Sequence, residues 1–424
     1  MTTTTEHPTR TQIEAAYRER TPRSHALYER ARAVFPGGDF RRAAFLGPYP
    51  PYIERAEGAY LHDADGNRYV DMNGDYTVMV AGHGHPDVLA AVHEAVDRST
   101  ALGLPSPNVV ELGEALTRRI ASLERVRFTC SGTEAVMFAI RGARAFTGKT
   151  KIMKMEGAYH GTYDPVEDVK LGVPEAAYDG LVLGRYNDRE YTERVFLENK
   201  DELAAVIVAI GVGSDAPRDG FLSFVREITE RHGVLFILDE VVSFRLSPGG
   251  AQEVYGVRPD LTTMGKNIGG GFAIGAFGGR TEVMDVFSPE REYSAHHSGT
   301  FVATPVAMAA GLATLRLLDR EAIARINQMG ERLRDGIRST LDELEIAGAA
   351  ENVGSIVTLK LAADAALPAR APGSAGTMTL ALMNHGVFAR TNTFTVCTPM
   401  SDDDIEATVR AVRGSLLDVR PMLT

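Results

Sequence analysis

The stretch Val234–Gly279, VLFILDEVVSFRLSPGGAQEVYGVRPDLTTMGKNIGGGFAIGAFGG, contains the features that decide the fold. It opens with the apolar run Val234–Leu238, which predicts a strand buried on both faces of a parallel sheet. The acidic pair Asp239-Glu240 follows at once, and open α/β sheets bind ligands at the carboxyl ends of their strands. A second apolar run, Leu261–Met264, leads into Gly265-Lys266 and a run of glycines. The stretch therefore predicts an α/β protein with a carboxylate that faces a ligand site.

Lys266 has two interpretations. An isolated Gly-Lys is most often a surface lysine in a glycine-rich turn. Lys266 could instead form a Schiff base, with the glycines letting the backbone come close to a planar cofactor. Pyridoxal phosphate needs a lysine amine for its aldehyde and a carboxylate that keeps the pyridine nitrogen protonated, so that the ring acts as an electron sink. Asp239 and Lys266 have the chemistry for both tasks.

The same segment resembles the signature of the class III, fold type I, pyridoxal-phosphate aminotransferases. The shared pattern is an apolar strand, Asp-Glu-Val, an arginine-containing loop, Pro-Asp, and Gly-Lys followed by glycines. The resemblance runs from about Arg30 to the C-terminal helix and is strongest to the branch of glutamate-1-semialdehyde aminomutase and β-phenylalanine aminotransferase. With this context we favour the Schiff-base interpretation of Lys266 and expect pyridoxal 5′-phosphate as the cofactor.

The resemblance also implies the domain organisation. It implies an α/β fold of type I with a mostly parallel seven-stranded sheet in a large domain, and a smaller α+β domain built from the two termini. We expect a disordered tail at residues 1–10, an N-terminal segment at 11–75 that joins the small domain, the large cofactor-binding domain at 76–305, and the C-terminal part of the small domain at 306–424.

Composition narrows the class of protein. A chain of 424 residues fits two or three domains, and 44% hydrophobic with 24% charged residues describes an ordinary soluble globular protein. The net charge of −11 and the absence of clustered Lys and Arg argue against nucleic acid or an anionic membrane as a partner. Cys130 and Cys397 form no disulfide framework, and the sequence has neither an apolar leader nor an 18-residue apolar run. We therefore predict a cytoplasmic enzyme.

A phosphate site is predicted at the start of the helix that follows the short strand Arg127–Thr129. The free N–H groups and the dipole at a helix N-terminus attract phosphate, although an isolated Ser-Gly-Thr is more often an ordinary N-cap. The resemblance places the family's phosphate-binding Ser-Gly-Thr at Ser131, Gly132 and Thr133.

Other cofactor contacts follow from the resemblance alone. It implies that Tyr159 stacks on the cofactor ring, that His160 supports it, and that Val241 packs on the opposite face. Thr300 corresponds to a residue that touches the phosphate bound by the other subunit, which implies a homodimer with shared active sites. The adjacent histidines 296–297 have no acidic or cysteine partner near them in the sequence, so we expect no metal site.

The substrate side of the site is predicted at two arginines. In the family, the segment after Phe35–Gly38 carries an arginine that holds the substrate carboxylate, a task suited to the bidentate guanidinium fork. Arg41 matches best, Arg42 is the alternative, and a solvated loop is the simplest explanation of both. Arg390 is a candidate second carboxylate ligand, with a surface arginine as the alternative.

The chain departs from its relatives at three places. The strand expected at Leu203–Ile210 is followed by Gly211 rather than by Glu-Pro, Thr162 stands where aminomutases tend to have a second histidine, and the loop after Phe388 lacks the aminomutase glutamate. We favour transamination between a β- or ω-amino acid, or a related amine, and a 2-oxo acid. Intramolecular transfer, as in the aminomutase, is the alternative, and racemisation or decarboxylation on the same scaffold stays open. The missing Glu-Pro also prompts a different class of function, a non-catalytic binding protein with this fold.

Overall fold

The computed structural model describes residues 8–41, 44–211, 216–218, 220–362, 376–390 and 392–423. Its contacts divide the chain into two compact units. The first unit contains the described residues up to Tyr76, Val80–His85, and those from Arg325 onward. The second contains Thr77–Met79 and Pro86–Ala324.

A seven-stranded sheet forms the centre of the second unit. Its order is β4 (Arg125–Thr129), β10 (Gly275–Gly279), β9 (Leu261–Gly265), β8 (Leu235–Asp239), β7 (Leu203–Ala209), β5 (Lys151–Met155) and β6 (Leu181–Gly184). Only the pairings of β10 are antiparallel among these strands, since β9, β8, β7, β5 and β6 pair in parallel. The prediction of a mostly parallel seven-stranded sheet is confirmed.

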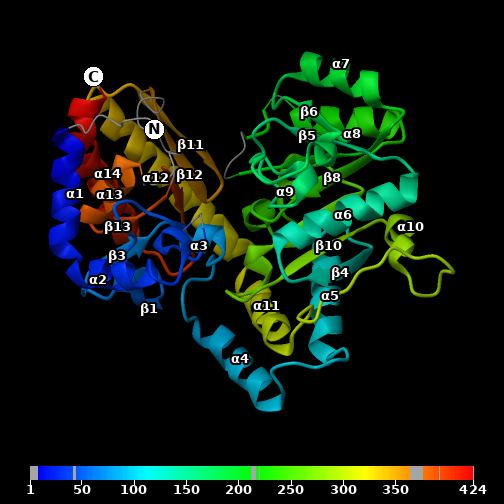
Figure 1. Ribbon diagram of the computed structural model, residues 1–424, viewed down its shortest axis with the longest axis horizontal. Coiled ribbons are helices and arrows are strands. Elements are labelled where there is room, and N and C mark those ends of the chain that lie inside the picture. The colour runs from blue at the N-terminus through cyan, green and yellow to red at the C-terminus, as the bar shows by residue number, and fades with distance from the viewer. Residues whose placement is uncertain are drawn as a thin grey trace. The chain divides into compact units, whose positions relative to one another are not determined.

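Helices pack around this sheet. The helices of the second unit are α4 (Pro86–Arg98), α5 (Pro107–Arg119), α6 (Gly132–Thr147), α7 (Arg189–Asn199), α8 (Phe221–Arg231), α9 (Ala251–Tyr255), α10 (Thr281–Met284) and α11 (Pro305–Leu317). In Figure 1, α6 lies close beside the sheet strands. Its small buried residues Ala135 and Ala139 belong to the same hydrophobic core cluster as Ile237 and Phe277 of the sheet. This packing brings the first turn of α6 to the strand ends where a ligand site is expected.

Helix α11 corrects the predicted start of the small domain at residue 306. Its buried side chains, Met308 and Leu312 among them, share a core with Leu112 and Leu116 of α5, and α11 also packs against α4. The helix therefore belongs to the second unit, because its apolar residues are covered there.

The first unit joins the two ends of the chain. Its four-stranded sheet has the order β1 (Ile53–Glu57), β2 (Tyr60–Asp63), β3 (Arg68–Asp71) and β13 (Val387–Phe388), and the parallel pairing of β13 with β3 ties the C-terminal part to the N-terminal part. Figure 1 shows the blue and the orange-to-red elements of this unit side by side. A second sheet contains β11 (Gly348–Val353), β12 (Ile356–Leu361) and β14 (Thr393–Thr395). The predicted α+β unit built from both termini is therefore present.

The helices of the first unit include α1 (Pro8–Arg20), α2 (Pro22–Ala31), most of α12 (Arg320–Glu343), α13 (Thr377–Asn384), α14 (Asp402–Val419) and the single turn α3 (Gly74–Thr77). Helix α1 corrects the predicted disordered tail at residues 8–10, and the rest of that tail, residues 1–7, lies outside the described residues. The helix already begins at Pro8, and proline suits the first position of a helix because its missing N–H needs no partner there. In the described parts of both units, no helix combines the length and apolar character needed to cross a membrane.

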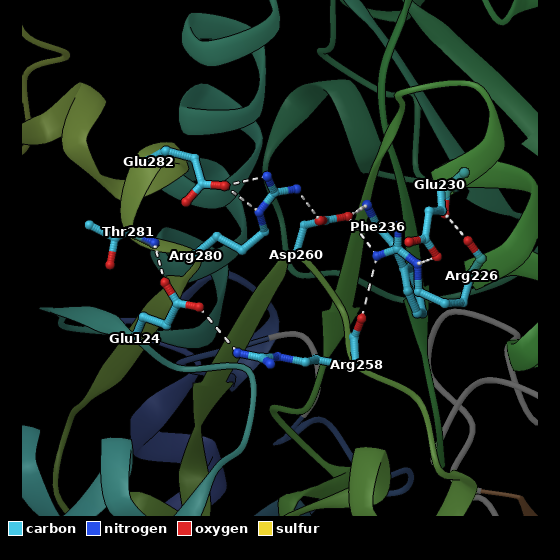
Figure 2. A network of polar contacts seen from close by, with 10 residues as sticks. Glu124, Arg226, Glu230, Phe236, Arg258, Asp260, Arg280, Thr281 and Glu282 are labelled. Carbon is cyan, nitrogen blue, oxygen red and sulfur yellow. Dashed lines mark hydrogen bonds and ion pairs between the residues drawn. The ribbon is translucent and has the colours of Figure 1, made fainter.

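A polar network holds the sheet at the amino end of β9 (Figure 2). The buried Asp260 accepts a hydrogen bond from the N–H of Phe236 on β8 at 2.8 Å. It also forms ion pairs of 2.8 Å with Arg226 of α8 and with Arg280, which directly follows β10. One carboxylate thus connects three neighbouring strands and a helix. Because β8 and β9 are parallel, the network lies at the end of the sheet opposite Asp239.

Candidate active site

Asp239 and Lys266 leave the sheet at the same edge. Strands β8 and β9 pair in parallel with Asp239 opposite Thr263, and Lys266 follows β9 directly. Asp239 is only 5% exposed and Lys266 is half-buried. Lys266 has a φ of 45°, a left-handed conformation that is uncommon outside glycine and that surrounding structure must hold in place. The two residues predicted to share one ligand therefore lie at neighbouring strand ends.

The carboxylate of Asp239 is held by three hydrogen bonds. Its Oδ2 lies 2.8 Å from Nδ1 of His160, while Oδ1 accepts from the Thr263 hydroxyl at 2.9 Å and from the N–H of Val241 at 3.2 Å. These contacts come from three different segments, so the orientation of the carboxylate is set by tertiary structure. Thr263 was not predicted, because only the strand register identifies it as the residue beside Asp239.

The predicted phosphate site lies at the N-terminus of α6. Ser131 is the N-cap, and its hydroxyl oxygen accepts from the N–H of Glu134 at 3.2 Å. The carboxylate of Glu134 in turn accepts from the N–H of Cys130 at 2.8 Å. The N-cap interpretation of Ser131 is therefore correct as local structure. It is compatible with phosphate binding, because a serine hydroxyl that accepts a hydrogen bond still has its own proton to donate.

Gly132 is where the helix terminus meets the segment after β8. A Cβ atom at this position would lie 2.9 Å from Cγ1 of the half-buried Val241. Any larger residue would displace Val241 or the first turn of α6. The backbone of Gly132 therefore packs closely against Val241, which leaves no room for a side chain at position 132.

The loop that contains Tyr159 and His160 is tied to both Asp239 and the α6 terminus. His160 is buried and contacts Asp239, and its Nε2 is buried without a hydrogen-bond partner among the described residues. Gly161 has a φ of 86°, and a Cβ atom there would lie 2.4 Å from the Thr133 hydroxyl, which accepts from the N–H of Thr162 at 3.3 Å. Tyr159 itself is 57% exposed. Partial burial, and then the negative charges of Glu167 and Asp239, raise the pKa of the Tyr159 phenol.

Thr300 lies in the segment between the buried Phe287 and α11, and its side chain is exposed. Its neighbour Phe301 is 66% exposed, and Tyr293 of the same segment is 85% exposed. This segment therefore presents large apolar side chains together with Thr300 on the surface of the second unit.

The two arginines predicted to bind substrate belong to the first unit. Arg41 forms an ion pair of 2.8 Å with Asp75, and its guanidinium lies 5.0 Å from the ring centre of Tyr76. The guanidinium of Arg390 lies 5.9 Å from the same ring and donates to the carbonyl oxygen of Phe45 at 3.2 Å. Both guanidinium groups thus lie near the aromatic ring of Tyr76. Arg42 lies outside the described residues.

Asp75 and Tyr76 were missed because their position depends on an unusual turn. Gly74, Asp75 and Tyr76 have φ values of 54°, 46° and 58°, which makes this segment left-handed. Asp71 supports the turn, since its Oδ1 accepts from the N–H of Gly74 at 2.9 Å and its Oδ2 lies 2.8 Å from Nε2 of His83. The Asn-Gly-Asp run at residues 73–75 was the available sequence signal, because these residue types tolerate left-handed backbone.

Comparison with known proteins places this geometry in a family context. Residues 47–408 match the model of the family "Aminotransferase class-III". A glutamate-1-semialdehyde 2,1-aminomutase from Methanothrix thermoacetophila is 44% identical over 350 residues, which cover 78% of this chain and 80% of the relative.

Solved structures give a second comparison. An ω-transaminase from Sphaerobacter thermophilus superposes with a TM-score of 0.89 and 39% identity, covering 96% of this chain and 99% of the other. A β-phenylalanine aminotransferase from Variovorax paradoxus has a TM-score of 0.89 and 31% identity, with 98% and 99% covered. The chain is thus similar over 78% of its length to a protein named an aminomutase, and over 96–98% to structures described as transaminases.

Proposed function

Because the chain belongs to the class-III aminotransferases, we propose that it moves an amino group between a β- or ω-amino acid, or a related amine, and a 2-oxo acid. Enzymes of this family use pyridoxal 5′-phosphate, and this cofactor is bound in a similar transaminase structure. The chain is therefore a pyridoxal-phosphate-dependent enzyme of amino-group transfer. The choice of substrates and the roles of individual residues are our proposal.

The observation that carries the proposal is the convergence of Asp239, Lys266 and the first turn of α6 at one edge of the sheet. When bound, the cofactor supplies an electron-withdrawing ring that stabilises negative charge on the substrate carbon. Lys266 would hold the cofactor through its amine, and the same amine would carry a proton from and to the substrate carbon. Asp239, oriented by its three hydrogen bonds, keeps the pyridine nitrogen protonated.

The remaining assignments concern position. Ser131, Gly132 and Thr133 hold the phosphate through the donors of the α6 terminus. Tyr159 and Val241 would contact the cofactor ring. His160 keeps Asp239 in place, and its second ring nitrogen is buried and unpartnered among the described residues, so it has a further interaction to offer to a bound molecule. The close contact of position 132 with Val241 supports this fit, because the cradle has no room for a side chain there.

We assign the substrate carboxylate to Arg41, with Arg390 as a second ligand. Both guanidiniums lie beside the ring of Tyr76, which limits their orientations. The ion pair of Arg41 with Asp75 adds a condition. A substrate carboxylate that binds Arg41 must exchange with, or share, the Asp75 carboxylate. Both members of the pair are about half exposed, so this exchange costs at most about 1 kcal/mol.

Intramolecular amino transfer is the second candidate function. It is favoured by the 44% identical relative, which is named an aminomutase. Intermolecular transfer is favoured by Thr162 in place of the histidine expected in aminomutases, and by similar structures described as an ω-transaminase and a β-phenylalanine aminotransferase. The two reactions differ in one requirement, because only the intermolecular reaction consumes a 2-oxo acid.

The test uses purified protein loaded with pyridoxal phosphate. We expect β- or ω-amino acids to bleach the visible absorption band of the lysine-bound cofactor, and pyruvate or 2-oxoglutarate to restore it with formation of the matching α-amino acid. Turnover of glutamate-1-semialdehyde without any 2-oxo acid, and no turnover of the amine panel, would decide for the aminomutase. Absence of a visible band even with added cofactor would support the non-catalytic alternative.

Lys266→Ala provides the residue-level test. We expect it to lose the covalent link, and with it the visible band, while an exposed control, Lys170→Ala, keeps both. Transamination at the parental rate by Lys266→Ala would refute the assignment.

We also propose a homodimer in which each Thr300 contributes to the phosphate site of the partner subunit. The exposed Tyr293 and Phe301 beside Thr300 support an interface at this segment, since large exposed apolar side chains mark contact surfaces. Light scattering should give twice the chain mass, and Thr300→Ala should weaken cofactor binding without changing that mass. The cytoplasmic location remains a prediction from the sequence.

A further inference from the structure

A fully buried lysine lies on β5, the strand that precedes the loop containing Tyr159 and His160. Lys154 is on β5 among the buried Met153 and Met155, and its own exposure is 0%. Its ammonium donates to the carbonyl oxygen of Ala158 at 3.1 Å, to that of Val166 at 2.8 Å, and to the Asp168 carboxylate at 2.7 Å. A lysine ammonium has three protons, so these acceptors use all of its donors.

The free-energy cost of burying a charge restricts where the three acceptors of Lys154 can lie. A buried ammonium is tolerated only when it is paired and hydrogen-bonded, because leaving water otherwise costs several kcal/mol. Any shift of one acceptor away from Nζ would leave a buried donor unsatisfied. The three acceptor groups are therefore held at fixed distances from β5.

All three acceptors belong to one segment, residues 158–168, which we call the clamp loop. Ala158 immediately precedes Tyr159, so the bond to its carbonyl fixes the peptide from which Tyr159 departs. The same loop contacts Asp239 through His160 and the Thr133 hydroxyl through the N–H of Thr162. The three hydrogen bonds of Lys154 thus connect this loop to strand β5 of the sheet.

We propose that Lys154 is a positioning residue for the cofactor: its buried ammonium fixes the clamp loop so that Tyr159 and His160 keep their places beside the ring. This inference depends on the proposed roles of Tyr159 and His160. It assigns a task to a lysine that makes no contact with the reacting atoms.

A purely structural lysine would have a different signature. Lys151, three positions earlier on β5, provides the comparison, because its ammonium donates to Asn199 at 3.0 Å and to Glu202 at 2.7 Å. Neither of these acceptors belongs to the clamp loop. Loss of either lysine could change stability. Only loss of Lys154 should change the affinity for the cofactor and the circular dichroism of its visible band.

The experiment compares Lys154→Met with Lys151→Met in the full-length protein. Met is apolar and of similar length, so it fills the buried volume without the charge. We expect Lys154→Met to weaken pyridoxal-phosphate binding at least tenfold, to change the circular dichroism of its visible band, and to speed amide exchange in residues 158–168. Lys151→Met should leave the dissociation constant and the dichroism within twofold of the parent.

Asp168→Asn covers the case in which Lys154→Met does not fold. Asp168 is 52% exposed, so its substitution spares the core while removing the charged acceptor. We expect it to weaken cofactor binding about two- to fivefold, in line with one partly exposed ion pair. Unchanged binding and dichroism in a folded Lys154→Met protein, or in Asp168→Asn if the former does not fold, would overturn the inference.

Tyr159→Ala separates failure of this inference from failure of the proposed site. If Tyr159→Ala weakens cofactor binding and Lys154→Met does not, only the role of Lys154 is wrong. If Tyr159→Ala binds the cofactor as the parent does, then the ring contact assigned to Tyr159 is wrong, and the role of Lys154 is overturned with it.

Discussion

Substitution of Asp260 by alanine should destabilise the sheet without disturbing the candidate active site. The variant removes the acceptor of the buried Phe236 N–H, and leaving such a donor unsatisfied costs about 1–3 kcal/mol. It also removes the nearer ion-pair partner of Arg226, whose side chain is 19% exposed and keeps Glu230 at 3.8 Å. Loss of one member of a fully buried pair costs about 3–5 kcal/mol, and this remaining contact reduces the cost here. Arg280 is 41% exposed and keeps Glu282, so its share is below about 1 kcal/mol.

These contributions overlap, because they share one carboxylate, and partial exposure of Arg226 reduces the second. We expect a net loss of about 3–4 kcal/mol in the free energy of unfolding, a large part of the 5–15 kcal/mol typical of folded proteins. The chain has no tryptophan, so urea unfolding is best followed by far-ultraviolet circular dichroism. Measurements need a fixed cofactor concentration, because a ligand that binds the folded state adds stability of its own.

Local and control measurements make the prediction specific. The Phe236 amide should exchange its hydrogen faster in Asp260→Ala, since that N–H donates to the missing carboxylate. Glu282→Gln, at a side chain that is 52% exposed, should cost less than about 1 kcal/mol. Cofactor affinity should stay within twofold of the parent, because Asp260 and Asp239 lie at opposite ends of the sheet. A loss below about 1 kcal/mol, with unchanged exchange at Phe236, would refute the reasoning.

Three further predictions concern binding and pH. Asp75→Asn should lower KM about two- to fivefold for amines that carry a carboxylate, because Arg41 no longer has an internal anionic partner, and KM for an amine without a carboxylate should not change. Gly132→Ala should weaken cofactor binding at least tenfold, because its Cβ would lie 2.9 Å from Val241. The double variant Gly132→Ala/Val241→Ala should recover much of the lost affinity. Equal loss of affinity in the single and the double variant would count against the contact. Burial raises the pKa of Tyr17 far above its ordinary value, so its phenol stays neutral in the folded state while the unfolded phenol ionises above about pH 10. The contribution of Tyr17 to stability is therefore complete below about pH 10 and falls as the pH rises further. Tyr17→Phe should lose about 1 kcal/mol of stability at neutral pH, because it lacks the hydrogen bond to the carbonyl oxygen of Tyr49. Its urea midpoint should decline less steeply than that of the parent between about pH 10 and 12.

The residues of the central stretch predicted an α/β protein with a carboxylate at a ligand site, and the resemblance to the class III aminotransferases implied the Schiff base at Lys266. The apolar run before Asp239 and the glycines after Lys266 were enough to predict buried parallel strands with functional groups at their ends, because strand burial and turn formation are encoded in neighbouring residues. The helix start at residues 131–133 was recognisable as a local signal, whereas its phosphate role was implied by the resemblance.

Only the tertiary structure decided which distant groups meet. Lys154 looked like one polar residue in an apolar strand, and its three acceptors became visible only once the loop at 158–168 had folded back onto β5. The pairing of Thr263 with Asp239 and the inclusion of α11 in the second unit likewise depend on strand register and helix packing. Such contacts join segments far apart in the chain, and their free energy comes from burial and from satisfying buried polar groups, which periodicity along the sequence does not record.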